Sequence, residues 1–154
     1  MLELIRSVVS RLRVYFKDRR RSPRLRVRLL FTVSIHRATN GDGSGKRAQT
    51  LKGHTRDISV KGLALLVPQI HFNGYHLAAE GRELKVDLDI GGGLPISILV
   101  VPRRYERLEE AELGCNYLIG ARILKLDEED RVRYLSLISE SLARQQHETR
   151  NKRA

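Results

Sequence analysis

Two short segments of the chain carry side chains whose chemistry suits a phosphorylated purine. In the first segment, Arg20 and Arg24 stand four positions apart, and Pro23 between them disfavours a helix. An arginine guanidinium can bind phosphate oxygens with two hydrogen bonds, pair with the O6 and N7 atoms of guanine, or stack on a purine ring. The segment therefore predicts contacts to a nucleotide, and Arg19 and Arg21 are further candidates for phosphate or stacking contacts.

The second segment complements these arginines. Asp57, Ser59 and Gly62 form the pattern Asp-x-Ser-x-x-Gly, followed by an apolar run. A carboxylate accepts hydrogen bonds from the N1 and N2 donors of guanine, which adenine lacks. Ser59 can donate to a phosphate, and Gly62 permits close backbone approach or a positive φ. An arginine run alone is most often a solvated face, and this pattern alone is often a plain turn. Together the two segments predict a site for a guanine nucleotide.

Composition and charge narrow the classes of protein to which this chain can belong. The chain has 154 residues, 41% hydrophobic, and a formal net charge of +11 that calls for an anionic partner. Most of the excess charge lies at the ends, since Arg6–Arg28 holds ten basic side chains and one acid.

The single cysteine, Cys115, excludes a disulfide framework and a cysteine-based zinc site. The five histidines are scattered without metal-ligand spacing, so no metal is expected. Met1–Ser10 lacks the apolar core of a signal peptide, and no segment reaches transmembrane length, so we expect a cytoplasmic protein.

The middle of the chain alternates apolar and polar residues, as short strands do. The predicted strands are Arg24–Arg37, Ala48–Ile58, Gly62–Val67, Glu83–Ile90, Ile96–Tyr105 and Cys115–Leu126. Turn residues separate them, and the stretch from His71 to His76 is expected to be a loop. Many short strands with regular turns indicate a mainly β fold, an antiparallel barrel of six to seven strands.

A helix is predicted on each side of this barrel. Apolar residues at steps of three and four in Leu2–Phe16 indicate a basic amphipathic helix over residues 1–18. The acids of Asp127–Asp130 open a C-terminal helix, where they complement the helix dipole. Its expected apolar stripe consists of Val132, Leu135, Ile138 and Leu142. We therefore divide the chain into the N-terminal helix (1–18), a barrel domain with its closing helix (19–145) and a disordered basic tail (146–154).

On these residues the chain resembles the PilZ domain, a bacterial receptor module for cyclic di-GMP. That family carries R-x-x-x-R before the first barrel strand and [D/N]-x-S-x-x-G where a later strand begins. Arg20 and Arg24 match the first motif, and Asp57, Ser59 and Gly62 match the second. The stretch from Ile119 to Ile123 is similar to the hydrophobic-Gly-x-x-hydrophobic pattern of the family's last strand. Arg24 and Arg28 also stand four apart, but Arg28 lies inside the alternating strand pattern, so we prefer Arg20 and Arg24.

The resemblance implies a PilZ-type barrel that binds cyclic di-GMP as a receptor or adaptor. No nucleophile–base constellation can be assembled from the sequence, so no enzyme is expected, and no cofactor or metal. The ligand-binding residues it implies are Arg20, Arg24, Asp57, Ser59 and Gly62, with Arg19 and Arg21 as weaker candidates. We expect the ligand to order the arginine-rich arm, 18–24, against the barrel and so change a surface that binds a downstream protein, which the sequence does not name.

Two other functions stay open. A basic small barrel is compatible with nucleic-acid binding, although the basic segment lacks the stacking aromatics that such proteins use, so no specific nucleic acid is expected. The N-terminal helix is compatible with weak contact to an acidic membrane surface, or with packing on the barrel or on a second copy in a homodimer.

Overall fold

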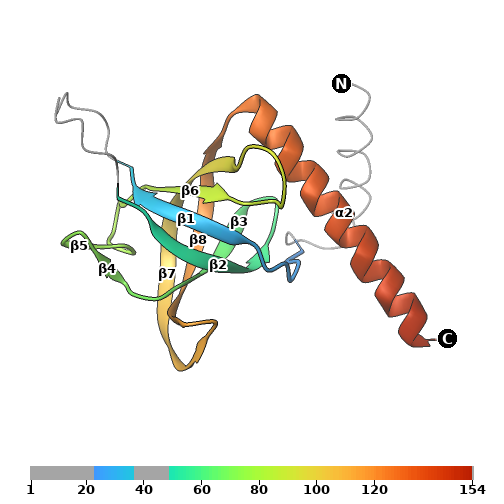
Figure 1. Cartoon of the computed structure of the whole chain (residues 1–154), viewed down its shortest axis with the longest axis horizontal. Helices are drawn as coiled ribbons and strands as arrows, with labels where there is room; N and C mark the ends of the chain where they lie inside the picture. The colour runs from blue at the N-terminus through green and yellow to red at the C-terminus, as the bar shows by residue number, and fades with distance from the viewer. Residues whose placement is uncertain (1–22, 37–48, 154) are drawn as a thin grey trace.

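The computed structural model describes residues 23–36 and 49–153. Six antiparallel strands close into a barrel in the order β1-β2-β3-β8-β7-β6, and a two-stranded hairpin, β4-β5, stands apart from it. The strands are β1 (Leu30–Ile35), β2 (Leu51–Ile58), β3 (Gly62–Val67), β4 (His71–Phe72), β5 (Tyr75–His76), β6 (Leu84–Leu88), β7 (Ile96–Glu112) and β8 (Cys115–Leu126). The helix α2 (Glu128–Arg153) follows, runs beside the barrel and extends past it (Figure 1).

The alternation of apolar residues explains the closure of the barrel. On β1, Phe31 and Val33 are buried in the core, and on β3 the same holds for Leu63 and Leu65. Successive residues of a strand point to opposite faces, so one apolar face per strand fills the interior. The predicted mainly β fold with a six- to seven-stranded antiparallel barrel and a C-terminal helix is confirmed. The predicted helix over residues 1–18 lies outside the described residues.

The segment before β1 is attached to β2 without being a strand. Leu25 and Ile58 exchange two backbone hydrogen bonds of 2.8 and 2.9 Å. The buried hydroxyl of Thr55 accepts a hydrogen bond from the Leu29 amide at 2.9 Å and donates one to the Val27 carbonyl at 2.5 Å. The strand predicted to begin at Arg24 thus begins at Leu30. The attachment brings Arg24 beside the end of β2.

The helix α2 is docked through its first half. Tyr134 and Ile138 are buried in the core, whereas the other three residues of the predicted stripe are only partly buried. Arg133 donates to the carbonyls of Leu94 and Pro95 in the β6–β7 loop. Acidic residues occupy the first turn as predicted.

The second half of α2 differs from the predicted disordered tail, because the helix continues to Arg153. No glycine or proline interrupts this stretch. Opposite charges also recur at i,i+4 spacing in Glu140, Arg144, Glu148 and Lys152, an arrangement that supports an exposed helix.

Two further differences concern polar stretches. The predicted loop from His71 to His76 is the hairpin β4-β5, whose turn residues Asn73 and Gly74 have φ angles of 54° and 80°. Positive φ at both central positions defines the tight turn that suits such a hairpin. The strand β7 runs on from Tyr105 to Glu112, where most side chains are exposed and the sequence therefore does not alternate.

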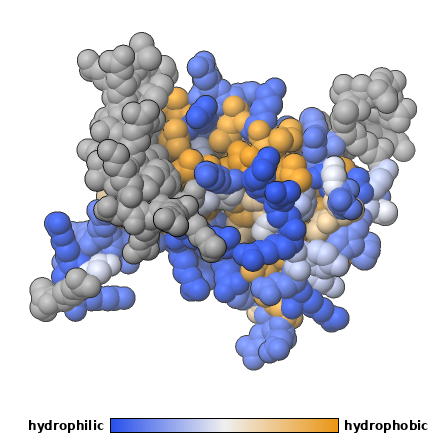
Figure 2. Space-filling view, turned by 180° about the vertical axis from the view of Figure 1, so that it is seen from behind, coloured by the Kyte–Doolittle hydropathy of each residue, from blue (hydrophilic) through white to orange (hydrophobic). Residues whose placement is uncertain are grey.

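Hydrophilic side chains cover most of the rear face of the described part (Figure 2). Figure 2 shows the rear face with an apolar region near its centre, surrounded by hydrophilic side chains. Among residues 23–36 and 49–153, no helix is long and apolar enough to cross a membrane. Within the same residues, no cluster of three or more His, Cys, Asp and Glu side chains could hold a metal ion.

Candidate functional site

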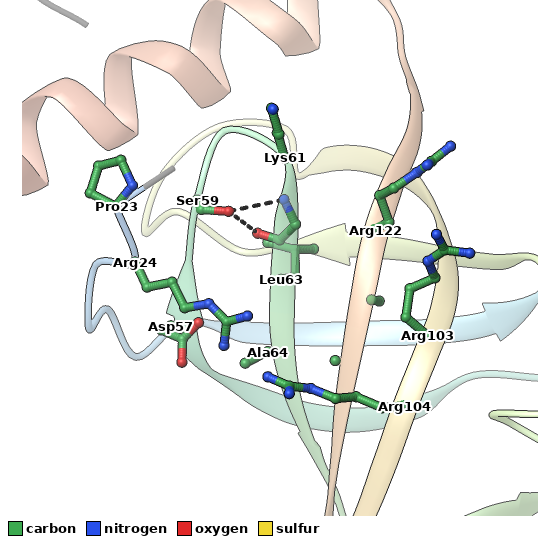
Figure 3. Close-up of a pocket in the computed structure, with 13 residues that line it drawn as sticks. Pro23, Arg24, Asp57, Ser59, Lys61, Leu63, Ala64, Arg103, Arg104 and Arg122 are labelled. Carbon is green, nitrogen blue, oxygen red and sulfur yellow. Dashed lines mark hydrogen bonds between the residues drawn. The ribbon is translucent and has the colours of Figure 1, made fainter. Parts of the chain in front are cut away.

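A cavity of about 1150 Å³ opens beside the attached N-terminal segment, over β3 and β8. Its charged lining consists of Arg24, Asp57, Lys61, Arg103, Arg104 and Arg122. Five of these six side chains are cations. The glycine and alanine residues of the lining add little bulk, so the charged groups surround an open space (Figure 3).

The strand register explains this arrangement. Asp57 pairs with Ala64, Ala64 with Gly120, and Gly120 with Arg104, so the four residues form one row across β2, β3, β8 and β7. Leu63 and Leu65, the neighbours of Ala64, belong to the core, so the row faces outward. Three strand spacings separate its ends by roughly 14 Å. The row therefore has the Asp57 carboxylate at one end, the backbone of Arg104 at the other, and a floor of the two smallest residue types between them.

The turn between β2 and β3 is closed by Ser59 and Gly62. The Ser59 amide donates to the Gly62 carbonyl at 2.9 Å, and the Gly62 amide donates to the Ser59 Oγ at 3.0 Å. The Ser59 hydroxyl in turn donates to the Gly62 carbonyl at 3.2 Å. The single proton of this hydroxyl is thus engaged within the turn, and the geometry gives Ser59 a role in shaping the turn.

Gly62 cannot carry a side chain in this geometry. A Cβ at this position would lie 2.6 Å from the backbone oxygen of Ala121 on β8. Contacts this short to backbone atoms force the strands apart. The glycine of the motif therefore permits close approach of β3 to β8 at the edge of the cavity.

The helix α2 contacts this turn through a hydrogen bond from its buried face. The Tyr134 hydroxyl donates to the Ser59 carbonyl at 2.5 Å, and the Tyr134 side chain is only 1% exposed. Burial raises the pKa of the Tyr134 phenol well above its ordinary value, although the hydrogen bond to Ser59 opposes this shift. The phenol remains a neutral donor, and its hydrogen bond links the backbone of the Asp-x-Ser-x-x-Gly motif to α2.

The cavity is electropositive. Among the described residues, the one ion pair within 4.0 Å joins Arg133 to Asp130, away from the cavity lining. Asp57 and the cavity arginines therefore form no ion pairs with one another or with other described side chains at that distance. Several cations facing one space attract an anion with more than one negative charge.

The structure brings together four of the predicted site residues. Arg24, Asp57, Ser59 and Gly62 line the same cavity, although the two segments are more than thirty positions apart in the sequence. Arg19, Arg20 and Arg21 lie outside the described residues. The alternative partner of Arg24, Arg28, lines a separate pocket of about 310 Å³.

Sequence reasoning missed the cations contributed by other elements. Lys61 stands inside the second motif and Arg122 inside the stretch from Ile119 to Ile123, so both were visible without being assigned a role. Arg103 and Arg104 lie on β7, outside both sequence motifs. Their position depends on the pairing of β7 with β8, which no local pattern reveals.

Fold and site together define an antiparallel six-stranded barrel with a basic cavity on its outer face. The family profile of the PilZ domain matches residues 18–140, so the chain belongs to the PilZ domain family. A comparison with curated proteins found no match.

Solved structures show the same fold. The PilZ domain with c-di-GMP of YcgR from Escherichia coli is 17% identical with a TM-score of 0.57, and the match covers 87% of this chain and 98% of that one. MrkH, described as a c-di-GMP-dependent transcription regulatory factor, is 25% identical with a TM-score of 0.53, over 81% of this chain and 51% of that one. The complex of K. pneumonia MrkH with c-di-GMP is 22% identical with a TM-score of 0.57, over 85% and 55%. The chain thus spans about half the length of the MrkH chains.

Proposed function

We propose that this protein is a bacterial, cytoplasmic receptor for cyclic di-GMP that acts as an adaptor and not as an enzyme. The observation that carries the proposal is the meeting of Arg24 with Asp57, Ser59 and Gly62 in one basic cavity. Membership of the PilZ family and the c-di-GMP named with the neighbouring structures support it.

The chemistry of the cavity suits this ligand. Cyclic di-GMP carries two phosphates, which the cavity's guanidinium groups would bind, and two guanines. The Asp57 carboxylate would accept hydrogen bonds from the N1 and N2 donors of one guanine. At about 1150 Å³ the cavity slightly exceeds the usual size range of small-molecule pockets, which leaves room for a dinucleotide.

Adaptor action would come from the arginine-rich arm. We propose that the ligand orders 18–24 against the barrel and thereby changes a surface for a downstream protein. The attachment of Leu25 to Ile58 supports this proposal, because it fixes the end of the arm beside the cavity. Hydrogen exchange over this segment should slow on ligand addition, and unchanged exchange would remove the switch while leaving binding intact.

Calorimetric titration tests the receptor role. The wild-type chain should bind cyclic di-GMP in preference to GTP and to short DNA at physiological salt. Arg24→Ala and Asp57→Ala should each weaken binding by at least about tenfold, because each removes a charged ligand contact. Arg28→Ala removes an equal charge outside the cavity and should leave affinity within about twofold of wild type, as expected for a change away from the ligand.

The opposite outcome identifies the rival function. Equal or tighter binding of DNA, with a steep salt dependence and no effect of Asp57→Ala, would show a nucleic-acid-binding barrel in place of a cyclic di-GMP receptor.

A further inference from the structure

No aromatic side chain of the described residues lines the cavity. Proteins that bind nucleotide bases commonly stack them on a planar side chain, and the loss of one such contact weakens binding by about 5- to 150-fold. In this cavity the planar groups able to stack are guanidinium groups, which also attract the π face of a base. The structure distinguishes one of these arginines from the others.

The Arg104 side chain lies across the cavity floor. A Cβ on Gly120 would lie 3.1 Å from Arg104 Cγ and 3.2 Å from its Nε, so the arginine stem crosses β8 where the glycine leaves room. Figure 3 shows the stem running over β8, with its guanidinium reaching Ala64 and directed toward Asp57. The planar group therefore lies on the floor of the row that ends at the carboxylate.

The other cavity arginines on this side are arranged differently. Arg103 falls at a register irregularity between Pro102 and Arg104, and it points away from Asp57, as does Arg122 (Figure 3). Both are placed at the rim. Arg104 alone among the β7 and β8 arginines belongs to the outward row with Ala64 and Gly120.

We propose that Arg104 is the stacking platform for a guanine of the ligand, namely the guanine whose N1 and N2 donors face Asp57. The inference rests on the proposed function and adds a base-contacting residue from outside both sequence motifs. The base would lie on the guanidinium plane above Ala64, and Gly120 keeps that plane low enough to leave space for it.

The test separates the plane of the side chain from its charge. Arg104→Lys keeps the charge and removes the plane, whereas Arg104→Trp keeps a plane and removes the charge. The chain has no tryptophan of its own, so the introduced indole gives a unique fluorescence signal. Arg107→Lys and Arg107→Trp serve as matched controls, because Arg107 is an exposed arginine of the same strand outside the cavity lining. Cyclic di-GMP is titrated into each purified full-length chain.

We expect Arg104→Lys to bind at least about tenfold more weakly than wild type, and Arg104→Trp to bind within about threefold. Saturating ligand should quench the indole fluorescence of the Arg104→Trp variant, since guanine would stack on it, and should leave that of Arg107→Trp largely unchanged. Wild-type affinity in Arg104→Lys, or a loss of about tenfold or more in Arg104→Trp, would overturn the stacking role. If the wild-type chain itself does not bind cyclic di-GMP, the proposed function fails first.

Discussion

The two walls of the cavity are built in different ways. We call the turn with Asp57, Ser59 and Gly62 the motif wall, and the β7–β8 side with Arg103, Arg104 and Arg122 the arginine wall. The motif wall is fixed by short-range hydrogen bonds between Ser59 and Gly62 and by the buried Tyr134 behind them. The arginine wall consists of exposed long side chains on two strands, and within the described residues none of them forms an ion pair.

This difference gives the walls different tasks. A wall with fixed backbone atoms can hold a carboxylate in the position that guanine requires. The long cationic side chains at the rim of the arginine wall, Arg103 and Arg122, adapt to phosphates and contribute less individually, because solvent screens them. Changes in the motif wall should therefore have large effects on both folding and binding, and changes at the rim of the arginine wall should have small effects on binding alone.

The largest effect is expected for Gly62→Ala. The new Cβ would meet the Ala121 backbone oxygen at 2.6 Å, so β3 must move away from β8 at the motif wall. We expect affinity for cyclic di-GMP to fall by about 100-fold and the free energy of unfolding to fall by about 1–3 kcal/mol, as overpacking commonly costs. Calorimetry and denaturant unfolding measure the two effects.

Gly92→Ala is the matched control for this change. A Cβ added at Gly92 would have no heavy atom within 4 Å, and the φ of this residue is not positive, so the added methyl group meets open space. The affinity and stability of this variant should stay near wild type, within about 0.5 kcal/mol. Normal ligand binding by Gly62→Ala would contradict a rigid motif wall.

The next largest effect is expected for Tyr134→Phe. The change leaves the Ser59 carbonyl without its buried donor, which typically costs about 1–3 kcal/mol of the free energy of unfolding. Affinity should fall by several-fold, because the turn loses its support. Tyr105→Phe removes a hydroxyl from a residue that is 51% exposed and should change neither quantity. Equal stability of Tyr134→Phe and wild type would show that α2 does not support the motif wall.

Alkaline pH provides a second test of the same contact. Burial raises the pKa of Tyr134 in the folded state, whereas a tyrosine in the unfolded chain ionises with a pKa of about 10. The unfolded state therefore loses its proton first, and the contribution of Tyr134, fully present below about pH 10, declines as the pH rises further. The stability difference between wild type and Tyr134→Phe should shrink above that pH in urea unfolding experiments.

The same contrast between the motif wall and the arginine wall explains how much of this site the sequence predicts. The motif wall was predictable because Ser59 and Gly62 form hydrogen bonds with each other three positions apart. The bounds of β3 follow from a short apolar run between turn residues, and those of β8 from its strand-forming residues after the turn. The arginine wall was not predictable. Arg104 reaches Gly120 only through a pairing that shifts register between Pro102 and Arg104, and sequence does not reveal such bulges.

Tyr134 was missed for a related reason. The predicted apolar stripe of α2 included Ile138, which is buried in the core, but it ran through Val132 and Leu135, which are only partly buried, and left out the buried Tyr134. A tyrosine is compatible with either a buried or an exposed position, and which one it takes depends on a partner for its hydroxyl. That partner is a backbone carbonyl on another element, 75 positions away in the sequence.

The smallest effect is expected at the rim, for Arg122→Ala. Arg122 is exposed and lines the cavity opposite Gly62, so its charge should attract the ligand's phosphates through partly screened interactions. Affinity should fall by about two- to fivefold at low salt, and the difference should vanish near about 0.5 M salt because the screening length then falls to a few ångströms. Lys125→Ala removes an exposed charge from the same strand outside the cavity lining and should have no such effect. A loss for Arg122→Ala that persists at high salt would mean a direct, desolvated contact, and the arginine wall would then be as specific as the motif wall.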